Sequence, residues 1–77
     1  MVVAMDEVVF GRTLKKLRVA KGLSQEELAF RAKLHRTYVS QLERGEKSPS
    51  LKTIDRLARA LDLKPSALLL KVERFSS

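Results

Sequence analysis

The fold of this chain is decided by two short stretches, LSQEELA at residues 23–29 and HRTYVSQL at residues 35–42. Ser24 and Glu27 have the spacing of a capping box, in which each side chain bonds the other residue's backbone N–H at the start of a helix. Ala29 lies where a second helix must cross closely, and its small side chain suits that crossing. Only a tight connection separates the two stretches. They therefore predict two short helices joined by a turn.

The second stretch has one apolar and one polar face. Val39 and Leu42 share the apolar face, because helical periodicity brings residues three apart to the same side. The opposite face carries the polar side chains Arg36, Thr37, Ser40 and Gln41. A rigid helix with such side chains is typical of the helix that a helix-turn-helix protein places in the major groove of DNA. We therefore predict a helix-turn-helix motif over about residues 24–44.

Length and charge limit the classes of protein that remain. The chain has 77 residues, enough for one domain with a single small core. It has no cysteine, which excludes disulfides and thiolate metal sites and fits a reducing compartment. No apolar run approaches the length needed to cross a bilayer. A formal net charge of +7 favours a polyanionic partner, although charge alone fits DNA, RNA or an acidic lipid surface equally well.

Helical periodicity continues on both sides of the motif. Before it, apolar residues recur at helical spacing at Phe10, Leu14 and Leu17. After it, Ser50 caps a helix whose apolar face is formed by Leu51, Ile54, Leu57, Ala58 and Leu61. Pro65 suits the first position of a last helix over about residues 65–75. The sequence thus predicts an all-α, compact five-helix single domain over residues 1–77.

A longer pattern carries a family resemblance. Its parts are LKKLR at 14–18, KGLSQEELA at 21–29, RTYVSQLERG at 36–45, PSL at 49–51 and LARAL at 57–61. With these motifs the chain resembles the Xre/Cro-like, or lambda-repressor-like, helix-turn-helix family of phage repressors and small bacterial regulators. The resemblance implies the compact lambda-repressor-like fold and a sequence-specific DNA-binding regulator of transcription. The small size and the HRTY opening are also similar to controller proteins of restriction–modification systems.

Three residues depart from the family pattern. Lys33 lies in the turn where the family usually has glycine, at a position that often needs a positive φ. A left-handed lysine would cost about 1 kcal/mol relative to glycine, which a packed domain can absorb. His35 stands where serine or threonine commonly caps the reading helix, and Lys64 where a similar cap often precedes the last helix. We expect these departures to weaken local helix starts and to leave the fold intact.

The resemblance assigns base reading to four residues of the second stretch, Arg36, Thr37, Ser40 and Gln41. Arginine can donate two hydrogen bonds to guanine, a threonine methyl suits the thymine methyl, and glutamine can pair with adenine. Phosphate contacts are implied for six further residues, Ser24, Gln25, Tyr38, Arg44, Lys47 and Ser48. The alternative is an ordinary solvated polar surface, which for Lys47 fits equally well.

Two further roles concern assembly of the domain and of a dimer. Similar proteins pair the residues matching Arg18 and Glu43 as a structural ion pair that ties the first helix to the reading helix. The last helix is apolar over more than one face, through Leu68, Leu69, Leu70, Val72 and Phe75. Because large exposed apolar patches usually mark an interface, we expect this helix to form a homodimer. The alternative is a set of scattered surface hydrophobes near a chain end.

Other functions find less support. No His/Cys/Asp cluster has metal-ligand spacing, and no phosphate-binding glycine loop or nucleophile elbow is present, so we expect no enzyme activity, cofactor or small-molecule ligand. The main alternative is a protein-interaction module on the same fold, such as an antitoxin or a bridging factor. Arg36 and Gln41 on the reading face argue against that as the sole role. We expect a homodimer that binds double-stranded DNA at a palindromic operator in the bacterial cytoplasm, at the nucleoid, without membrane contact.

Overall fold

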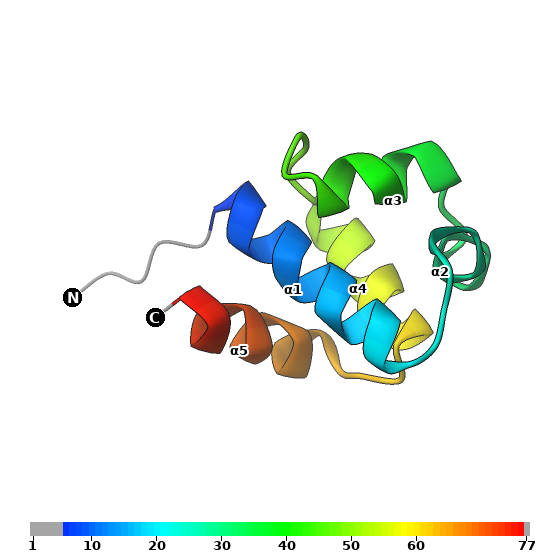
Figure 1. Cartoon of the computed structure of the whole chain (residues 1–77). Coiled ribbons are helices and arrows are strands. Elements are labelled where there is room, and N and C mark those ends of the chain that lie inside the picture. The colour runs from blue at the N-terminus through cyan, green and yellow to red at the C-terminus, as the bar shows by residue number, and fades with distance from the viewer. Residues whose placement is uncertain (1–5, 77) are drawn as a thin grey trace.

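Helices make up most of the chain (Figure 1). The computed structural model describes residues 6–76, with side chains up to residue 75. Its five helices are α1 (Glu7–Ala20), α2 (Gln25–Ala32), α3 (Arg36–Glu43), α4 (Leu51–Ala60) and α5 (Pro65–Ser76). No strand occurs among the described residues, so the expected all-α, five-helix architecture is confirmed.

The helices of the motif begin at capping side chains. Ser24 and Glu27 form the predicted capping box at the start of α2, with both hydrogen bonds 3.0 Å long. At the start of α3 His35 takes the place of the usual serine or threonine, because its Nδ1 accepts the backbone N–H of Thr37 at 3.2 Å. Ser50 caps α4 as expected. Local sequence therefore fixes where each of these helices starts.

Two residues other than glycine adopt left-handed backbone conformations. Lys33 ends α2 with a φ of 57°, which confirms the positive φ expected there. Asp62 follows α4 with a φ of 59°, a conformation that aspartate tolerates better than most residues. Its carboxylate accepts a hydrogen bond from the ammonium group of Lys21, so the turns that end α4 and α1 are joined.

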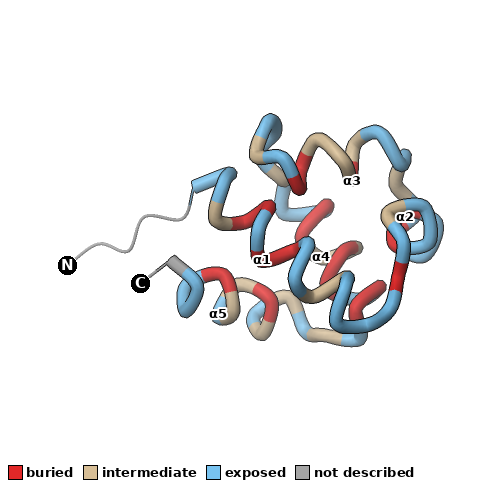
Figure 2. Tube along the Cα trace, viewed as in Figure 1, coloured by how far each residue is buried: buried red, intermediate tan, exposed pale blue. Residues whose placement is uncertain are grey.

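The core lies where the inner faces of all five helices meet (Figure 2). Each helix contributes one leucine that is 0% exposed, namely Leu14, Leu28, Leu42, Leu57 and Leu68. Fully burying a leucine stabilises the folded state by about 2 kcal/mol. Together these side chains hold the two motif helices at a fixed angle, which a reading helix requires.

One residue of the expected apolar face of α4 lies outside the core. Leu51 is 83% exposed, whereas Leu57 on the same helix is 0% exposed. The expectation for Leu51 is therefore wrong. Helical spacing assigns a residue to a face, but it does not tell how far along the helix the neighbouring elements extend, and Leu51 is the first residue of α4.

Gly11 lets α1 and α3 approach each other closely. A Cβ added at this position would lie 2.3 Å from the carbonyl oxygen of Leu42 and 2.7 Å from that of Glu43. Real Cβ atoms do not come so near to backbone oxygens, so any larger residue would push the two helices apart. The C-terminal end of α3 is thus placed directly on the backbone of α1.

Candidate nucleic-acid interface

The helix α3 lies at the edge of the molecule, with one face on the core and one toward solvent (Figures 1 and 2). Val39 and Leu42 are both 0% exposed on the inner face. On the outer side, a shallow depression is lined by Arg36, Thr37, Ser40 and Arg44. Gln41 is half-buried and does not line this depression. Three of the four expected base-reading residues therefore surround one concave surface.

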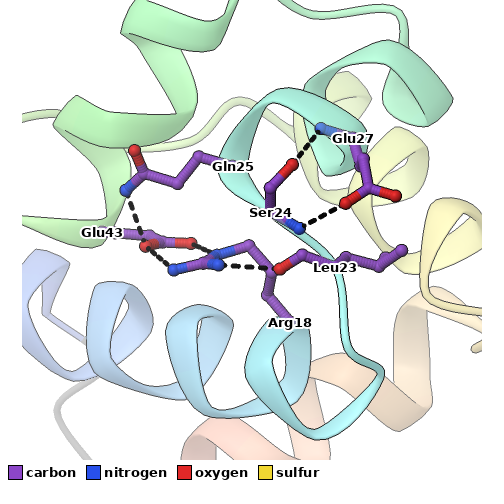
Figure 3. Close-up of polar contacts among 6 residues, drawn as sticks. All are labelled: Arg18, Leu23, Ser24, Gln25, Glu27 and Glu43. Atoms are coloured by element: carbon purple, nitrogen blue, oxygen red, sulfur yellow. Dashed lines mark hydrogen bonds and ion pairs between the residues drawn. The ribbon is translucent and has the colours of Figure 1, made fainter.

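A second depression joins the start of α2 to the start of α3. Its lining residues are Arg18, Ser24, Gln25, Glu26 and Arg36. The Ser24 hydroxyl accepts a hydrogen bond from the backbone of Glu27, so its own hydrogen can still be donated to a phosphate (Figure 3). The capping bond from the backbone N–H of Ser24 holds the pKa of the Glu27 carboxyl below its usual value.

An ion pair beneath this surface connects three helices (Figure 3). The guanidinium of Arg18 donates to both carboxylate oxygens of Glu43, from Nε to Oε2 at 2.6 Å and from Nη2 to Oε1 at 3.0 Å. Its Nη1 donates to the carbonyl oxygen of Leu23 at 2.8 Å. The two side chains are only 12% and 2% exposed. The pair thus ties α1 to the end of α3 and to the segment that leads into α2.

Gln25 also belongs to this network, which its sequence position alone did not indicate. The side-chain Nε2 of Gln25 donates to Oε1 of Glu43 at 3.0 Å. This bond orients the amide of Gln25, the first residue of α2, beside the surface that carries Arg36. The residue expected to hold a phosphate is therefore fixed by the buried ion pair.

A second arginine–glutamate pair lies on the outer surface. Arg44, the residue after α3, donates from Nε to Oε2 of Glu46 at 2.6 Å and from Nη2 to Oε1 at 3.4 Å. Its Nη1 donates to the hydroxyl oxygen of Ser40 at 2.5 Å. The side chains of Arg44 and Glu46 are 56% and 50% exposed. This hydrogen bond between Arg44 and Glu46 stabilises the charged form of both groups. It therefore lowers the pKa of the Glu46 carboxyl and raises the pKa of the Arg44 guanidinium. Sequence patterns gave no sign of Glu46.

Of the other expected phosphate contacts, Tyr38 lies on α3, and Lys47 and Ser48 lie in the α3–α4 connection. The Tyr38 hydroxyl lies 3.4 Å from that of Thr53, and Tyr38 as a whole is half-buried. Lys47 is exposed. Ser48 donates its hydroxyl hydrogen to Oε1 of Glu7 at 2.5 Å, which lowers the pKa of Glu7. Because this bond uses the only hydroxyl hydrogen of Ser48, a phosphate contact from that hydrogen requires the bond to Glu7 to break.

The expected dimer surface on α5 is smaller than its sequence indicated. Leu68 and Val72 are 0% exposed and belong to the core of the monomer, so the expectation that they contact a partner subunit is corrected. Leu70 and Phe75 are 48% and 49% exposed, and Leu69 is half-buried. The ammonium of Lys16 lies 4.7 Å from the centre of the Phe75 ring. Three of the five residues therefore remain available to a partner.

Two features of other protein classes are absent from residues 6–76. None of the five helices is both long and apolar enough to cross a membrane. No three histidine, aspartate or glutamate side chains in this part of the chain gather closely enough to hold a metal ion.

The matches to known proteins extend well beyond the two motif helices. The helix-turn-helix family matches residues 14–68. The control protein C.BamHI from Bacillus amyloliquefaciens is 43% identical over 63 residues, which cover 80% of this chain and 78% of that protein. The crystal structure of the restriction–modification controller protein C.AhdI from Aeromonas hydrophila matches with a TM-score of 0.78 and 53% identity, covering 80% of this chain and 94% of that one. A structure of the nucleoprotein complex of C.Esp1396I matches with a TM-score of 0.83 and 26% identity over 91% of both chains.

Proposed function

Because the chain belongs to the lambda-repressor-like, or Xre-type, helix-turn-helix family, we propose that it is a DNA-binding transcriptional regulator whose helix α3 reads base edges in the major groove. The observation that carries this proposal is the outer face of α3, where Arg36, Thr37 and Ser40 surround one depression. That face is presented rigidly, because the inner face of the same helix is fully buried.

Each polar group has a role that its chemistry supports. The guanidinium of Arg36 suits the O6 and N7 atoms of guanine, and the methyl group of Thr37 suits that of thymine. Gln41 is half-buried and would reach an adenine from the margin of the surface. We assign phosphate binding to Gln25, at the positive N-terminus of α2, and to the hydroxyl of Ser24. Further phosphate contacts fall to Tyr38, Arg44, Lys47 and Ser48.

The regulator acts as a homodimer in this proposal. An open depression on α5 is lined by Ser66, Ala67, Leu69, Leu70 and Glu73. A two-fold contact would bring the same patches of two subunits together and remove the exposed apolar surface of Leu70 and Phe75 from water. Two reading helices would then meet an inverted repeat with half-site centres about 10 bp apart. Residues 1–77 would act as one domain of this dimer, at the nucleoid of a bacterial cytoplasm.

Two substitutions separate base reading from phosphate binding. The wild-type protein is first used to select its preferred duplex from a random pool, and a scrambled duplex of the same composition serves as the reference. We expect Arg36→Ala to cost about 1–3 kcal/mol on the selected duplex and to relax discrimination at one base pair. Gln25→Ala is the matched control, because a lost phosphate contact weakens both duplexes about equally.

Binding titrations at several salt concentrations, with circular dichroism to verify folding, measure these effects. An unchanged ratio of the two affinities in Arg36→Ala would show that α3 does not read bases as proposed. A wild-type protein that selects no duplex at all would contradict DNA binding and favour a protein-interaction module.

A further inference from the structure

Three side chains form a continuous contact at the margin of the reading surface. Glu46 holds the guanidinium of Arg44, and Arg44 in turn donates to the hydroxyl oxygen of Ser40. Gly45 makes this possible, because its φ of +74° turns the chain back so that Arg44 and Glu46 meet. We call these residues the Glu46 relay. Two of its members, Ser40 and Arg44, line the same depression as Arg36.

The hydrogen bonds of the relay leave it able to bind DNA. A guanidinium has five N–H donors, and Arg44 uses three of them, one on each nitrogen. One N–H on Nη1 and one on Nη2 remain for a phosphate oxygen. The hydroxyl of Ser40 accepts from Arg44, so its own hydrogen is left to donate to an acceptor on a base edge. Arg44 therefore orients Ser40 while it still presents donors of its own.

The charges of the relay have the opposite effect on DNA binding. Sequence-independent affinity grows with the number of phosphates that lysine and arginine neutralise. The carboxylate of Glu46 compensates the charge of Arg44 at this surface. The positive charge of Lys47 also attracts the Glu46 carboxylate. An anion in this place repels the backbone of every duplex equally, whatever its sequence. Glu46 thus opposes non-specific binding.

Resting on the proposed DNA-binding function, we propose that Glu46 is a positioning residue that sets sequence discrimination, because it orients Arg44 against Ser40. Its charge separately weakens attraction to DNA of any sequence. Removing its charge adds one uncompensated cation, which strengthens binding to all duplexes. It also frees Arg44 from its fixed position, which weakens the Ser40 contact on the preferred duplex alone. The affinity for the scrambled duplex therefore rises, because only the change in charge acts on it. On the selected duplex the gain from charge and the loss of the Ser40 contact partly cancel.

The test compares Glu46→Gln with wild type on the selected and the scrambled duplex. We expect the affinity for the scrambled duplex to rise severalfold and the slope of log affinity against log salt to steepen by about 0.9 per subunit, the value for one more neutralised phosphate. The affinity for the selected duplex should change less. The ratio of the two affinities should therefore fall by about a factor of three or more.

The matched control is Asp62→Asn. It makes the same change in net charge and also breaks an exposed ion pair, that with Lys21. Asparagine tolerates the φ of 59° at this position. The residue lies in the turn between α4 and α5. In Figure 1 this turn is on the opposite side of the molecule from α3. We expect this variant to keep the affinity ratio and most of the salt slope of wild type.

A further variant separates positioning from charge. Ser40→Ala should lower the affinity ratio without steepening the salt slope, and adding Glu46→Gln to it should lower the ratio little further, since both act on one contact. An affinity ratio in Glu46→Gln equal to that of wild type or of Asp62→Asn overturns the inference, while selection of a duplex by wild type would still support the proposed function. A wild-type protein that selects no duplex overturns both.

Discussion

Glu43 and Arg44 are neighbours at the end of α3, yet their side chains belong to different environments. Glu43 is 2% exposed in its side chain and is bonded to Arg18 and Gln25. The side chain of Arg44 is 56% exposed and is bonded to Glu46 and Ser40. Each forms an arginine–glutamate pair with a shortest distance of 2.6 Å. The difference teaches that the surroundings of such a pair, rather than its geometry, decide what it contributes.

The rotation of the helix explains the separation. Successive residues are turned by about 100° around a helix axis, so the side chains of Glu43 and Arg44 point in different directions. In the buried Arg18–Glu43 pair, each charge has lost its hydration and is stabilised by the other. Removing one partner leaves an uncompensated buried ion. Outside, solvent screens the pair and its contribution to folding is small. The inner pair therefore affects the stability of the fold. The outer pair affects the net charge of the proposed DNA-binding surface.

The largest expected effect is on the inner pair. Glu43→Gln leaves the charge of Arg18 without a partner and removes an acceptor from Gln25, so we expect a loss of about 3 kcal/mol in the free energy of unfolding. Chemical denaturation followed by circular dichroism measures it. The matched variant is Glu46→Gln, whose denaturation midpoint should stay close to that of wild type. Equal shifts in the two variants would remove the distinction between the inner and the outer pair.

A second contrast of inner and outer residues lies on α5. Leu68 is 0% exposed, so Leu68→Ala should lower the free energy of unfolding by about 2–5 kcal/mol. Leu70 is 48% exposed, and Leu70→Glu should leave the fold intact while placing an unpaired charge in the proposed dimer contact. We expect its dimer dissociation constant to rise at least tenfold, or about 1.4 kcal/mol. Sedimentation at micromolar concentration decides this, and a Leu70→Glu protein that stays folded and dimeric would place the interface elsewhere.

Much of the fold could be predicted because its signals are local. The capping box at Ser24 and Glu27 involves residues three apart, and the left-handed Lys33 was expected because similar proteins usually have glycine in that turn. The outward position of Arg36 follows from the burial of Val39 and Leu42 on the same helix. Spacing along the chain indicates the capping box and the outward position of Arg36, whereas the family resemblance indicates the left-handed Lys33.

What could not be predicted depends on contacts between distant segments. Gly11 is needed because α1 meets the backbone of α3, a distance that no spacing reveals. Leu68 and Leu70 have the same chemistry, and only the packing of α5 on the core separates the buried one from the exposed one. Glu46 lies in a polar loop, where nothing in the sequence indicates that Gly45 turns it back to Arg44.

The contrast between the two arginines can be observed directly in solution. The Nε–H groups of Arg18 and Arg44 each donate to a glutamate at 2.6 Å, and each gives its own signal in a nitrogen–proton correlation spectrum at slightly acidic pH. On titration with the selected duplex we expect the signals of Arg44 and Arg36 to move, because the outer face of α3 enters the groove. The signal of Arg18 should stay in place, because the buried pair is kept. Stationary Arg36 and Arg44 signals, with shifts confined to α5 or to Arg18, would contradict the account.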